Sequence, residues 1–198
     1  MSSVIEFLAF KQRRDVPTLV LVDLHREAAG KDGAAHAETP AIARALANCR
    51  AALRHARAQN MSVAFIRRVE RSASLLDTRA YPSWLAGFEP GRMDMVFDRR
   101  LPSCYTSVEF VDMANYVDGN YVLAGLFGET SCLSTAVDAF HRNHRLTFLT
   151  DASASRGFED VPADSMHDSV TAIISLYGTV ATTQSWIRAT SQALGESQ

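Results

Sequence analysis

The chain has 198 residues, of which 47% are hydrophobic and 21% charged, proportions typical of a globular protein rather than a disordered one. The 20 basic and 22 acidic residues give a formal net charge of -2 at pH 7. So balanced a charge gives no electrostatic reason to expect a nucleic acid or an anionic membrane as a partner.

The first predicted strand and helix lie within residues 18–60. Residues 18–23, TLVLVD, form an apolar, β-branched run that ends in an acid, which is typical of a parallel strand buried on both faces. A helix is predicted to follow from Thr39, the expected N-cap, with Pro40 in its first turn. Cys49 lies on the apolar face of this helix, and we interpret it as a core residue.

A second buried strand is predicted over residues 61–67, MSVAFIR. The segment that follows, residues 68–104, shows little periodicity. An irregular segment of that length inside a compact domain is usually functional or contains short elements of its own.

The second half of the chain alternates helices and strands. Helices are predicted over residues 107–117, 131–143 and 163–178, strands over residues 120–125, 145–151 and 179–183, and a short helix in the tail from residue 185. Such alternation predicts right-handed crossovers and a sheet covered on both faces. We therefore expect one α/β domain over residues 1–198, with residues 1–16 as an N-terminal extension. Its expected architecture is a three-layer α/β/α fold around a mostly parallel sheet of five to six strands.

The three cysteines, Cys49, Cys104 and Cys132, form no CxxC pair and are odd in number. A disulfide framework is therefore not expected, and zinc-ligand spacing is absent. The first residues place Glu6 inside a short apolar run and positive charges after it, which is the wrong order for a signal peptide. The expected location is the cytoplasm, without a membrane span.

Several polar residues are predicted to meet at one edge of the sheet, because ligands of open parallel sheets bind beyond the carboxyl ends of the strands. Asp23 ends the first strand, Arg67 and Arg68 end the second, Cys132 follows the third, and Asp151 ends the fourth. No GxGxxG or Walker-type loop follows a strand, so nucleotide binding loses its main support.

Cys132 has two interpretations on position alone. A helix N-terminus favours a thiolate through the helix dipole and free N–H groups, and a loop at the end of a strand gives solvent access. The alternative is an inert cysteine packed where the helix begins. Asp23 also has two interpretations: it is either a helix cap or the general base for a nearby thiol.

Four segments resemble, in the same order, the isochorismatase-like cysteine hydrolases, which include nicotinamidase, N-carbamoylsarcosine amidohydrolase, and ureide and biuret amidohydrolases. TLVLVDLH is similar to the family's first strand with its catalytic aspartate, and CLSTAVDAFHRNHRLTFLTDASAS to its cysteine, helix and following strand. FEPGRMDMVFDRRLPSCYTS resembles the segment around its central lysine, and MHDSVTAIISLYGTVATTQSWI its closing helix and strand. The resemblance covers roughly residues 17–187 and implies the family's α/β/α fold.

The resemblance implies three catalytic residues. Asp23 matches the general base and Cys132 the nucleophile, while Arg99 stands where the family has a lysine, with Arg100 beside it. An arginine keeps the positive charge and is expected to hold the Asp23 carboxylate through a bidentate contact, but it does not readily give up a proton. The alternative is that both arginines are ordinary surface or loop charges.

The resemblance also implies groups around the reacting atoms. The family usually has a glycine six residues before the cysteine, whereas Gly125 lies seven residues before Cys132, as though one residue were inserted. Backbone N–H groups of Cys132 and of a residue near Gly128 are expected to bind the oxyanion. His25 either orients substrate or water, or is a plain histidine at a strand end. Arg100 and Trp84 are expected to contact the substrate.

Neither a metal nor a cofactor is expected, because the Asp-x-His metal element of nicotinamidases has no counterpart between residues 68 and 98. His167 resembles a histidine frequent in relatives, and we interpret it as structural. Relatives commonly form dimers or tetramers, so a homodimer or homotetramer is expected here. The aromatic segment with Tyr81 and Trp84 lines either a substrate pocket or a subunit contact.

The expected function is hydrolysis of a C–N bond in a small amide or ureide, through a thioester on Cys132 with Asp23 as general base. Two alternatives stay open. One is an isochorismatase-type vinyl-ether hydrolase that relies on Asp23 rather than on a thiol. The other is a catalytically degenerate relative that binds a metabolite, which the missing lysine supports. The substrate is expected to depend on residues 24–38 and 68–104, which carry no known fingerprint.

Overall fold

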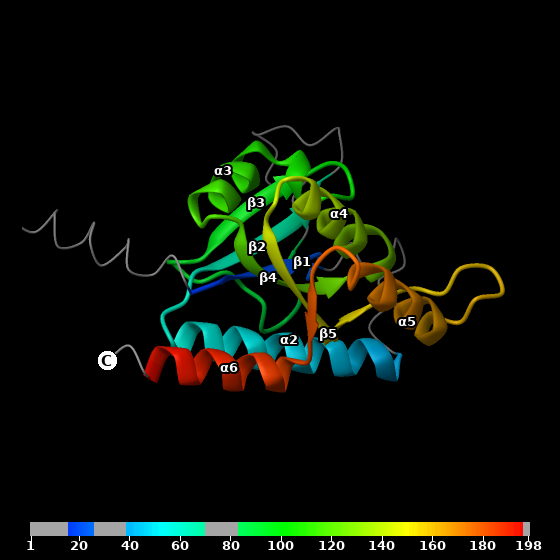
Figure 1. The fold of residues 1–198 in the computed structure, drawn as a ribbon. Coiled ribbons are helices and arrows are strands. Elements are labelled where there is room, and N and C mark those ends of the chain that lie inside the picture. Colours follow the sequence, from blue (N-terminus) through cyan, green and yellow to red (C-terminus); the bar gives the residue numbers. More distant parts are fainter. Residues whose placement is uncertain (1–15, 26–38, 70–82, 196–198) are drawn as a thin grey trace, which may run out of the picture.

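The computed structural model describes residues 16–25, 39–69 and 83–195. Its centre is a six-stranded sheet in the order β3-β2-β1-β4-β5-β6, in which every neighbouring pair is parallel (Figure 1). The strands are β1 (Thr18–Val22), β2 (Val63–Arg68), β3 (Met95–Arg99), β4 (Asn120–Leu126), β5 (Arg145–Ala154) and β6 (Thr179–Ala181). The predicted α/β fold is thus confirmed, with a sheet that is parallel throughout.

Helices cover both faces of this sheet, as Figure 1 shows. They are α2 (Pro40–Ala58), α3 (Val108–Tyr116), α4 (Leu133–His141), α5 (Ala163–Ile174) and α6 (Thr183–Gly195), with a 3₁₀ turn, η3 (Cys104–Thr106), and a π-helical turn, η4 (Gly128–Cys132). None of the helices in the described ranges is long and apolar enough to cross a membrane.

The two faces of β1 pack into two separate apolar clusters because side chains alternate along a strand. Leu19 and Leu21 pack with α2 on one face, where α6 lies beside α2 (Figure 1). Val20 and Val22 face the opposite cluster, which contains residues of α3, α4 and α5. The five residues of β1 are all buried, which explains why its apolar run could be read from the sequence.

The structure finds a strand in the irregular segment and corrects one expected boundary. Segment 68–104 contains β3, an edge strand in which Arg99 is the one buried residue. Its short MVFDR run therefore lacks the continuous apolar pattern of the inner strands. Strand β5 continues three residues beyond Asp151, so that aspartate lies within the strand rather than at its end.

The order of the strands along the sheet reverses between β1 and β4, and this point fixes the position of the candidate site. Helix α2 packs on one face of the sheet and α4 on the other, and in open parallel sheets ligands bind beyond the carboxyl ends of strands at such a point. Gly125 of β4 pairs with Val22 of β1, and a Cβ at this glycine would lie 2.1 Å from the Val22 carbonyl oxygen. A glycine is therefore required for the two strands to pair here.

Candidate active site

Asp23 is the residue directly after β1, and its backbone is left-handed, with φ of 58°. Its N–H still pairs with the Ile66 carbonyl of β2 at 3.0 Å, so the turn begins only after this residue. Aspartate tolerates this conformation better than most residues, and such strain gathers at functional sites. The side chain is 1% exposed, so its carboxylate needs partners within the protein.

Arg99, at the end of β3, supplies the positive partner and is itself 1% exposed. Its Nη2 donates to Asp23 Oδ2, and its Nη1 donates to the Leu101 carbonyl at 2.6 Å. The expected bidentate contact is wrong, because the second guanidinium nitrogen is used by the backbone. Arg100 is exposed, as expected for the neighbour of a buried strand residue, whose side chain points the opposite way.

Ser131 joins these two groups, and the sequence interpretation missed it. Its hydroxyl donates to Asp23 Oδ2 at 2.6 Å and accepts from Arg99 Nη2 at 2.7 Å. The available signal was the spacing: Ser131 lies six residues after Gly125. In the structure β4 runs to Leu126, and the turn η4 that carries Ser131 begins two residues later, at Gly128.

Cys132 lies next to this group but is packed in the apolar core with residues of α3, α4 and α5. The side chain is 0% exposed, and its Sγ lies 4.0 Å from the Leu126 carbonyl oxygen. Burial raises the pKa of this thiol well above its usual value, the nearby Cys104 and Asp23 raise it further, and Arg99 lowers it less. Among the described residues, no hydrogen bond joins this thiol to the Asp23 carboxylate.

The turn η4 that carries these residues begins at a strained position. Phe127 has a left-handed φ of 58°, and its carbonyl accepts from the N–H groups of Thr130 at 3.1 Å, Ser131 at 2.8 Å and Cys132 at 3.4 Å. π-Helical turns of this kind are rare and frequently occur at functional sites. A Cβ on Gly128 would lie 2.6 Å from Ser155 Oγ, so this glycine lets the turn pack against β5. The expected oxyanion role of Gly128 stays a prediction.

His25 lies beside Asp23, and Trp84 pairs with His25. His25 Nε2 is 3.7 Å from Asp23 Oδ1 and accepts from the Arg68 N–H at 3.3 Å. A short antiparallel bridge joins His25 to Trp84, and their rings meet edge to face. Trp84 also packs edge to face on Phe65. His25 is thus near the carboxylate, and Trp84 packs on His25. Tyr81 lies outside the described residues, as do residues 26–38 and 70–82 of the expected specificity segments 24–38 and 68–104.

Two other residues expected at this edge have structural partners. Arg67 forms a two-contact ion pair with Asp98, at 2.6 and 3.1 Å, which ties β2 to β3. The Asp151 carboxylate accepts from the N–H and hydroxyl of Thr183, both at 2.7 Å, at the first residue of α6. A carboxylate there satisfies the free N–H groups of the helix and its dipole.

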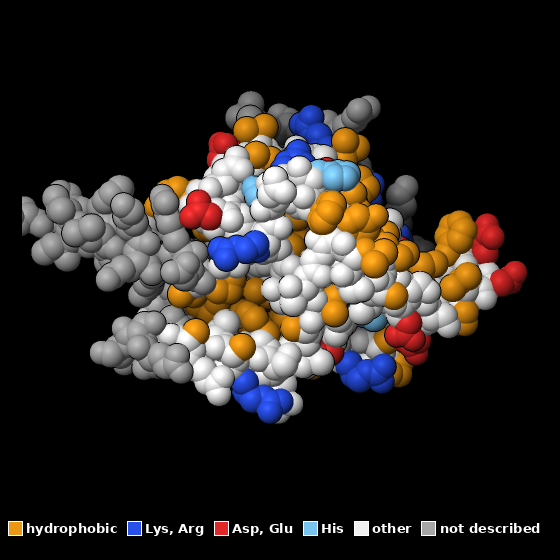
Figure 2. Space-filling model, in the orientation of Figure 1, with side chains coloured by type: hydrophobic (Ala, Val, Ile, Leu, Met, Phe, Trp, Pro, Cys, Tyr) orange, Lys and Arg blue, Asp and Glu red, His pale blue; other side chains and the backbone are white. Residues whose placement is uncertain are grey.

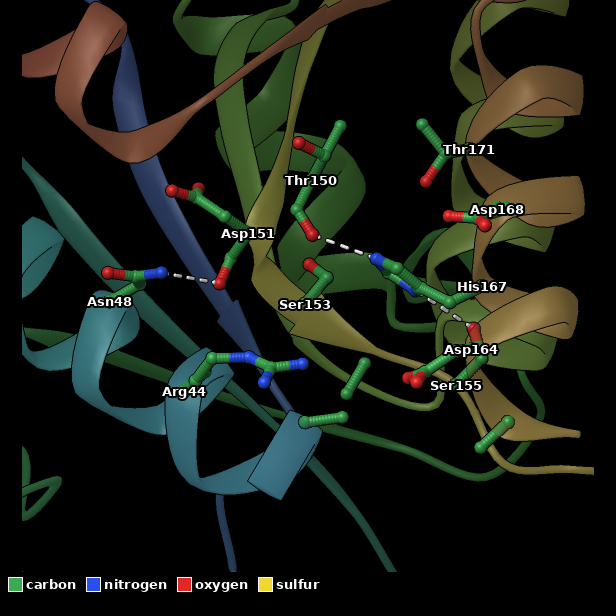
Figure 3. Close-up of a pocket in the computed structure, with 13 residues that line it drawn as sticks. Arg44, Asn48, Thr150, Asp151, Ser153, Ser155, Asp164, His167, Asp168 and Thr171 are labelled. Carbon is green, nitrogen blue, oxygen red and sulfur yellow. Dashed lines mark hydrogen bonds between the residues drawn. The ribbon is translucent and has the colours of Figure 1, made fainter. Parts of the chain in front are cut away.

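A cavity of about 440 Å³ lies apart from Asp23, between α2, β5 and α5 (Figure 3). Arg44 points into it from α2, and His167 from α5. His167 Nε2 lies 2.8 Å from the Thr150 carbonyl oxygen, and its Nδ1 lies 3.2 Å from Ser155 Oγ. The cavity is lined by none of Asp23, Arg99, Ser131 and Cys132. Its lining residues Ala154, Ser155 and His167 lie close to Gly128 of the turn η4.

Within the described part of the chain, no group of three or more His, Cys, Asp or Glu side chains could hold a metal ion. The polar contacts at Asp23 come from a guanidinium and a hydroxyl, and a guanidinium is not a metal ligand. The arrangement instead suits acid–base chemistry by a buried carboxylate.

Comparison with protein families agrees with this architecture. Residues 17–185 match the family model of the isochorismatase domain. The comparison with curated proteins gives no match.

Solved structures share the fold at low sequence identity. An isochorismatase from Pseudomonas putida KT2440 is 22% identical, covers 85% of this chain and 89% of its own, and has a TM-score of 0.73. A cysteine hydrolase from Pseudomonas syringae pv. phaseolicola 1448A is 20% identical, with 89% and 93% covered and a TM-score of 0.75. An N-carbamoylsarcosine amidase from Thermoplasma acidophilum is 22% identical, with 84% and 96% covered and a TM-score of 0.64.

Proposed function

The chain belongs to the isochorismatase family, and from this premise we propose that it hydrolyses a C–N bond of a small amide or ureide, with Asp23 as the general base. One observation carries the proposal: the two oxygens of the Asp23 carboxylate are held differently. Oδ2 is held by Arg99 and Ser131, whereas Oδ1 is buried and accepts no hydrogen bond within the described residues. A carboxylate that is fixed through one oxygen and accepts no hydrogen bond at the other keeps a basic oxygen available for proton transfer.

The proposed reaction uses that carboxylate in both halves. A nucleophile on the turn η4 attacks the carbonyl carbon and gives its proton to Asp23. The C–N bond then breaks, and Asp23 returns the proton to the departing nitrogen. Asp23 next takes a proton from water, which attacks the acyl-enzyme and releases the acid. Arg99 stays charged throughout, because a guanidinium does not lose its proton.

Ser131 and Cys132 are the candidate nucleophiles on this turn. The thioester route expected from the sequence requires the Cys132 thiol to reach the Asp23 carboxylate, which the Ser131 hydroxyl already contacts at Oδ2. The absence of a hydrogen bond between the Cys132 thiol and Asp23 among the described residues also supports a second candidate function, vinyl-ether cleavage with Asp23 as the acid. That reaction needs no thiol, and Cys132 lies in the apolar core.

The proposal is tested by measuring ammonia release from a panel of primary amides, ureides and carbamates. Asp23→Asn keeps the shape of the side chain but removes the base, so kcat/KM for the best substrate should fall by about 10²–10⁴-fold. Asp112→Asn, on the exposed face of α3, is the matched control and should leave the rate unchanged. Equal rates in wild type and Asp23→Asn would refute the proposal, and no release from any panel member would favour the ether or the binding alternative.

Two further expectations remain proposals. Three free, buried cysteines support a cytoplasmic location, because reducing compartments keep thiols unpaired. A homodimer or homotetramer is supported by apolar side chains gathered over α4 and α5 (Figure 2), where Phe140, Ile173 and Leu176 are exposed. Light scattering of the purified protein tests the oligomeric state, and a monomer mass would refute it.

A further inference from the structure

Ser131 and Cys132 are adjacent, yet they face opposite environments. The Ser131 hydroxyl touches both buried charges of the site, at 2.6 Å to Asp23 Oδ2 and 2.7 Å to Arg99 Nη2. The Cys132 thiol packs with the apolar residues beneath α3, α4 and α5. Consecutive residues on a helix point roughly 100° apart, so only one of these two side chains can face Asp23.

The helix that carries them is anchored on both sides, which keeps this orientation. On one side, Gly125 holds β4 against β1, and on the other the Ser131 carbonyl accepts from Thr135 Oγ1 at 2.7 Å. Turning the thiol toward Asp23 would break both hydrogen bonds of the Ser131 hydroxyl and would leave the Asp23–Arg99 pair without it. Leaving buried polar groups unpaired is costly, by about 1–3 kcal/mol for each group.

We propose that Ser131, and not Cys132, is the nucleophile, with Asp23 as its base and Arg99 as the group that holds Asp23. This assignment rests on the proposed hydrolytic function. The arrangement has the features of an activated nucleophile: the hydroxyl lies within hydrogen-bond reach of a base, and a third group orients that base. Cys132 is then a core residue, and its raised pKa, caused mainly by burial, keeps the thiol neutral.

The proposed step is an attack by Ser131 Oγ on the carbonyl carbon of the substrate. The Oγ–C bond forms while the hydroxyl proton moves to Asp23, because a carboxylate is too weak a base to remove that proton beforehand. Arg99 Nη2 donates to Oγ and so orients the hydroxyl toward Asp23, while the negative charge of the tetrahedral intermediate develops on the substrate carbonyl oxygen. The C–N bond breaks, the nitrogen takes the proton from Asp23, and an oxygen ester on Ser131 remains for water to hydrolyse.

A covalent probe tests the assignment without knowledge of the substrate. Phenylmethanesulfonyl fluoride should label Ser131, with an Oγ–S bond formed, fluoride released and the proton taken by Asp23. Peptide fragmentation by mass spectrometry should locate the adduct, which should resist dithiothreitol. Asp23→Asn should slow labelling by about 10²-fold or more, whereas Ser134→Ala, whose hydroxyl bonds to the Thr130 carbonyl, should label like wild type. A dithiothreitol-sensitive adduct on Cys132, or no adduct on Ser131, would overturn the proposal.

Kinetics on the best panel substrate supply the second test. Ser131→Ala should lower kcat by about 10³-fold or more, and Cys132→Ala should change it by less than about threefold. The double variant Ser131→Cys, Cys132→Ala should keep turnover and become sensitive to iodoacetamide. This second variant keeps the test informative if the Ser131→Ala chain does not fold.

The two proposals fail in different ways. Hydrolysis that is lost in Asp23→Asn and Cys132→Ala but kept in Ser131→Ala would overturn the role of Ser131 and leave the proposed function standing. A wild type that hydrolyses no panel member but is sulfonylated at Ser131 would overturn the proposed function and leave Ser131 as the reactive nucleophile.

Discussion

The titratable groups around Asp23 and those around the cavity beside β5 are held differently, although both lie toward the carboxyl ends of strands of the same sheet. At Asp23 the groups are almost fully buried, and Asp23 Oδ1 and Arg99 Nε have no hydrogen-bond partner among the described residues. At the cavity, the carboxylate of Asp151 and both ring nitrogens of His167 have hydrogen-bond partners, and Ser153 Oγ is the lining side-chain atom that is buried without a partner among the described residues.

We interpret the Asp23 group as the reactive site and the groups at the cavity as structural. Buried unpaired polar atoms and left-handed backbone at Asp23 and Phe127 are unfavourable by themselves, so the surrounding structure must hold them. Substitutions at the Asp23 site should therefore affect both stability and turnover. Substitutions at the cavity should affect stability alone, and four predictions test this contrast.

The largest effect is expected for Arg99→Met. The Arg99–Asp23 ion pair is buried on both sides, and removing the arginine leaves an unpaired buried carboxylate. The free energy of unfolding should fall by about 3–5 kcal/mol, as measured by urea denaturation. Arg100→Met is the control, since that side chain is exposed, and it should change stability by less than about 0.5 kcal/mol. Equal effects at the two arginines would contradict the burial of the pair.

Gly125→Ala should be the next most damaging change. The new Cβ would meet the Val22 backbone, which cannot move aside as a flexible side chain can, at a residue whose φ is +135°. Backbone strain of about 1–3 kcal/mol and a steric term of similar size should lower the free energy of unfolding.

Gly91→Ala is the matched control for this change. Its Cβ would come no closer than 3.4 Å, to the Asp94 carboxylate. It should cost less than about 1 kcal/mol in the same urea assay. A Gly125→Ala protein as stable as this control would show that β1 and β4 can separate without loss.

Asp151→Ala probes the cavity side of the comparison. It removes the acceptor for Thr183 at the start of α6, so the free energy of unfolding should fall by about 1–2 kcal/mol. Turnover at a temperature well below unfolding should remain within about twofold of wild type. Asp168→Ala, exposed on the same cavity, should change neither quantity. A loss of turnover as large as that of Asp23→Asn would make the cavity part of the active site.

The smallest effect is expected for thiol labelling of the native protein. All three cysteines are buried, and burial raises the pKa of Cys49 to about 12, that of Cys104 to about 11, and that of Cys132 well above its usual value. The neutral thiols stabilise the fold below the pKa of an unfolded thiol, near 8.5. This stability is lost as the pH rises toward the folded values.

Iodoacetamide should therefore label the native chain slowly at pH 7.5 and at pH 9, and rapidly in urea, with the alkylated residues identified by mass spectrometry. Rapid labelling of Cys132 alone at pH 7.5 would reveal a reactive thiolate and return the nucleophilic role to that residue.

Local patterns were sufficient for most of the fold. The continuous apolar run of β1 and the capped, periodic helix α2 carry their periods in adjacent residues, so both could be located from the chain. Strand β3 could not, because an outer strand is half exposed and short, and its identity depends on pairing with β2. Asp151 was misplaced because the length of β5 depends on its pairing with β4, where the register shifts near Gly125.

By itself, the sequence determined the parallel α/β architecture, the position of Asp23 after the first strand, and the turn that carries Ser131 and Cys132. Only the tertiary structure decided which of those two side chains meets Asp23. Residues 23, 99 and 131 lie at or after the ends of three strands that are far apart in the chain. Neighbouring residues on a helix point in different directions, so Ser131 faces Asp23 and Cys132 does not. A cysteine can be singled out in a sequence as a candidate nucleophile, whereas Ser131 can be singled out only from its contact with the buried Asp23 carboxylate.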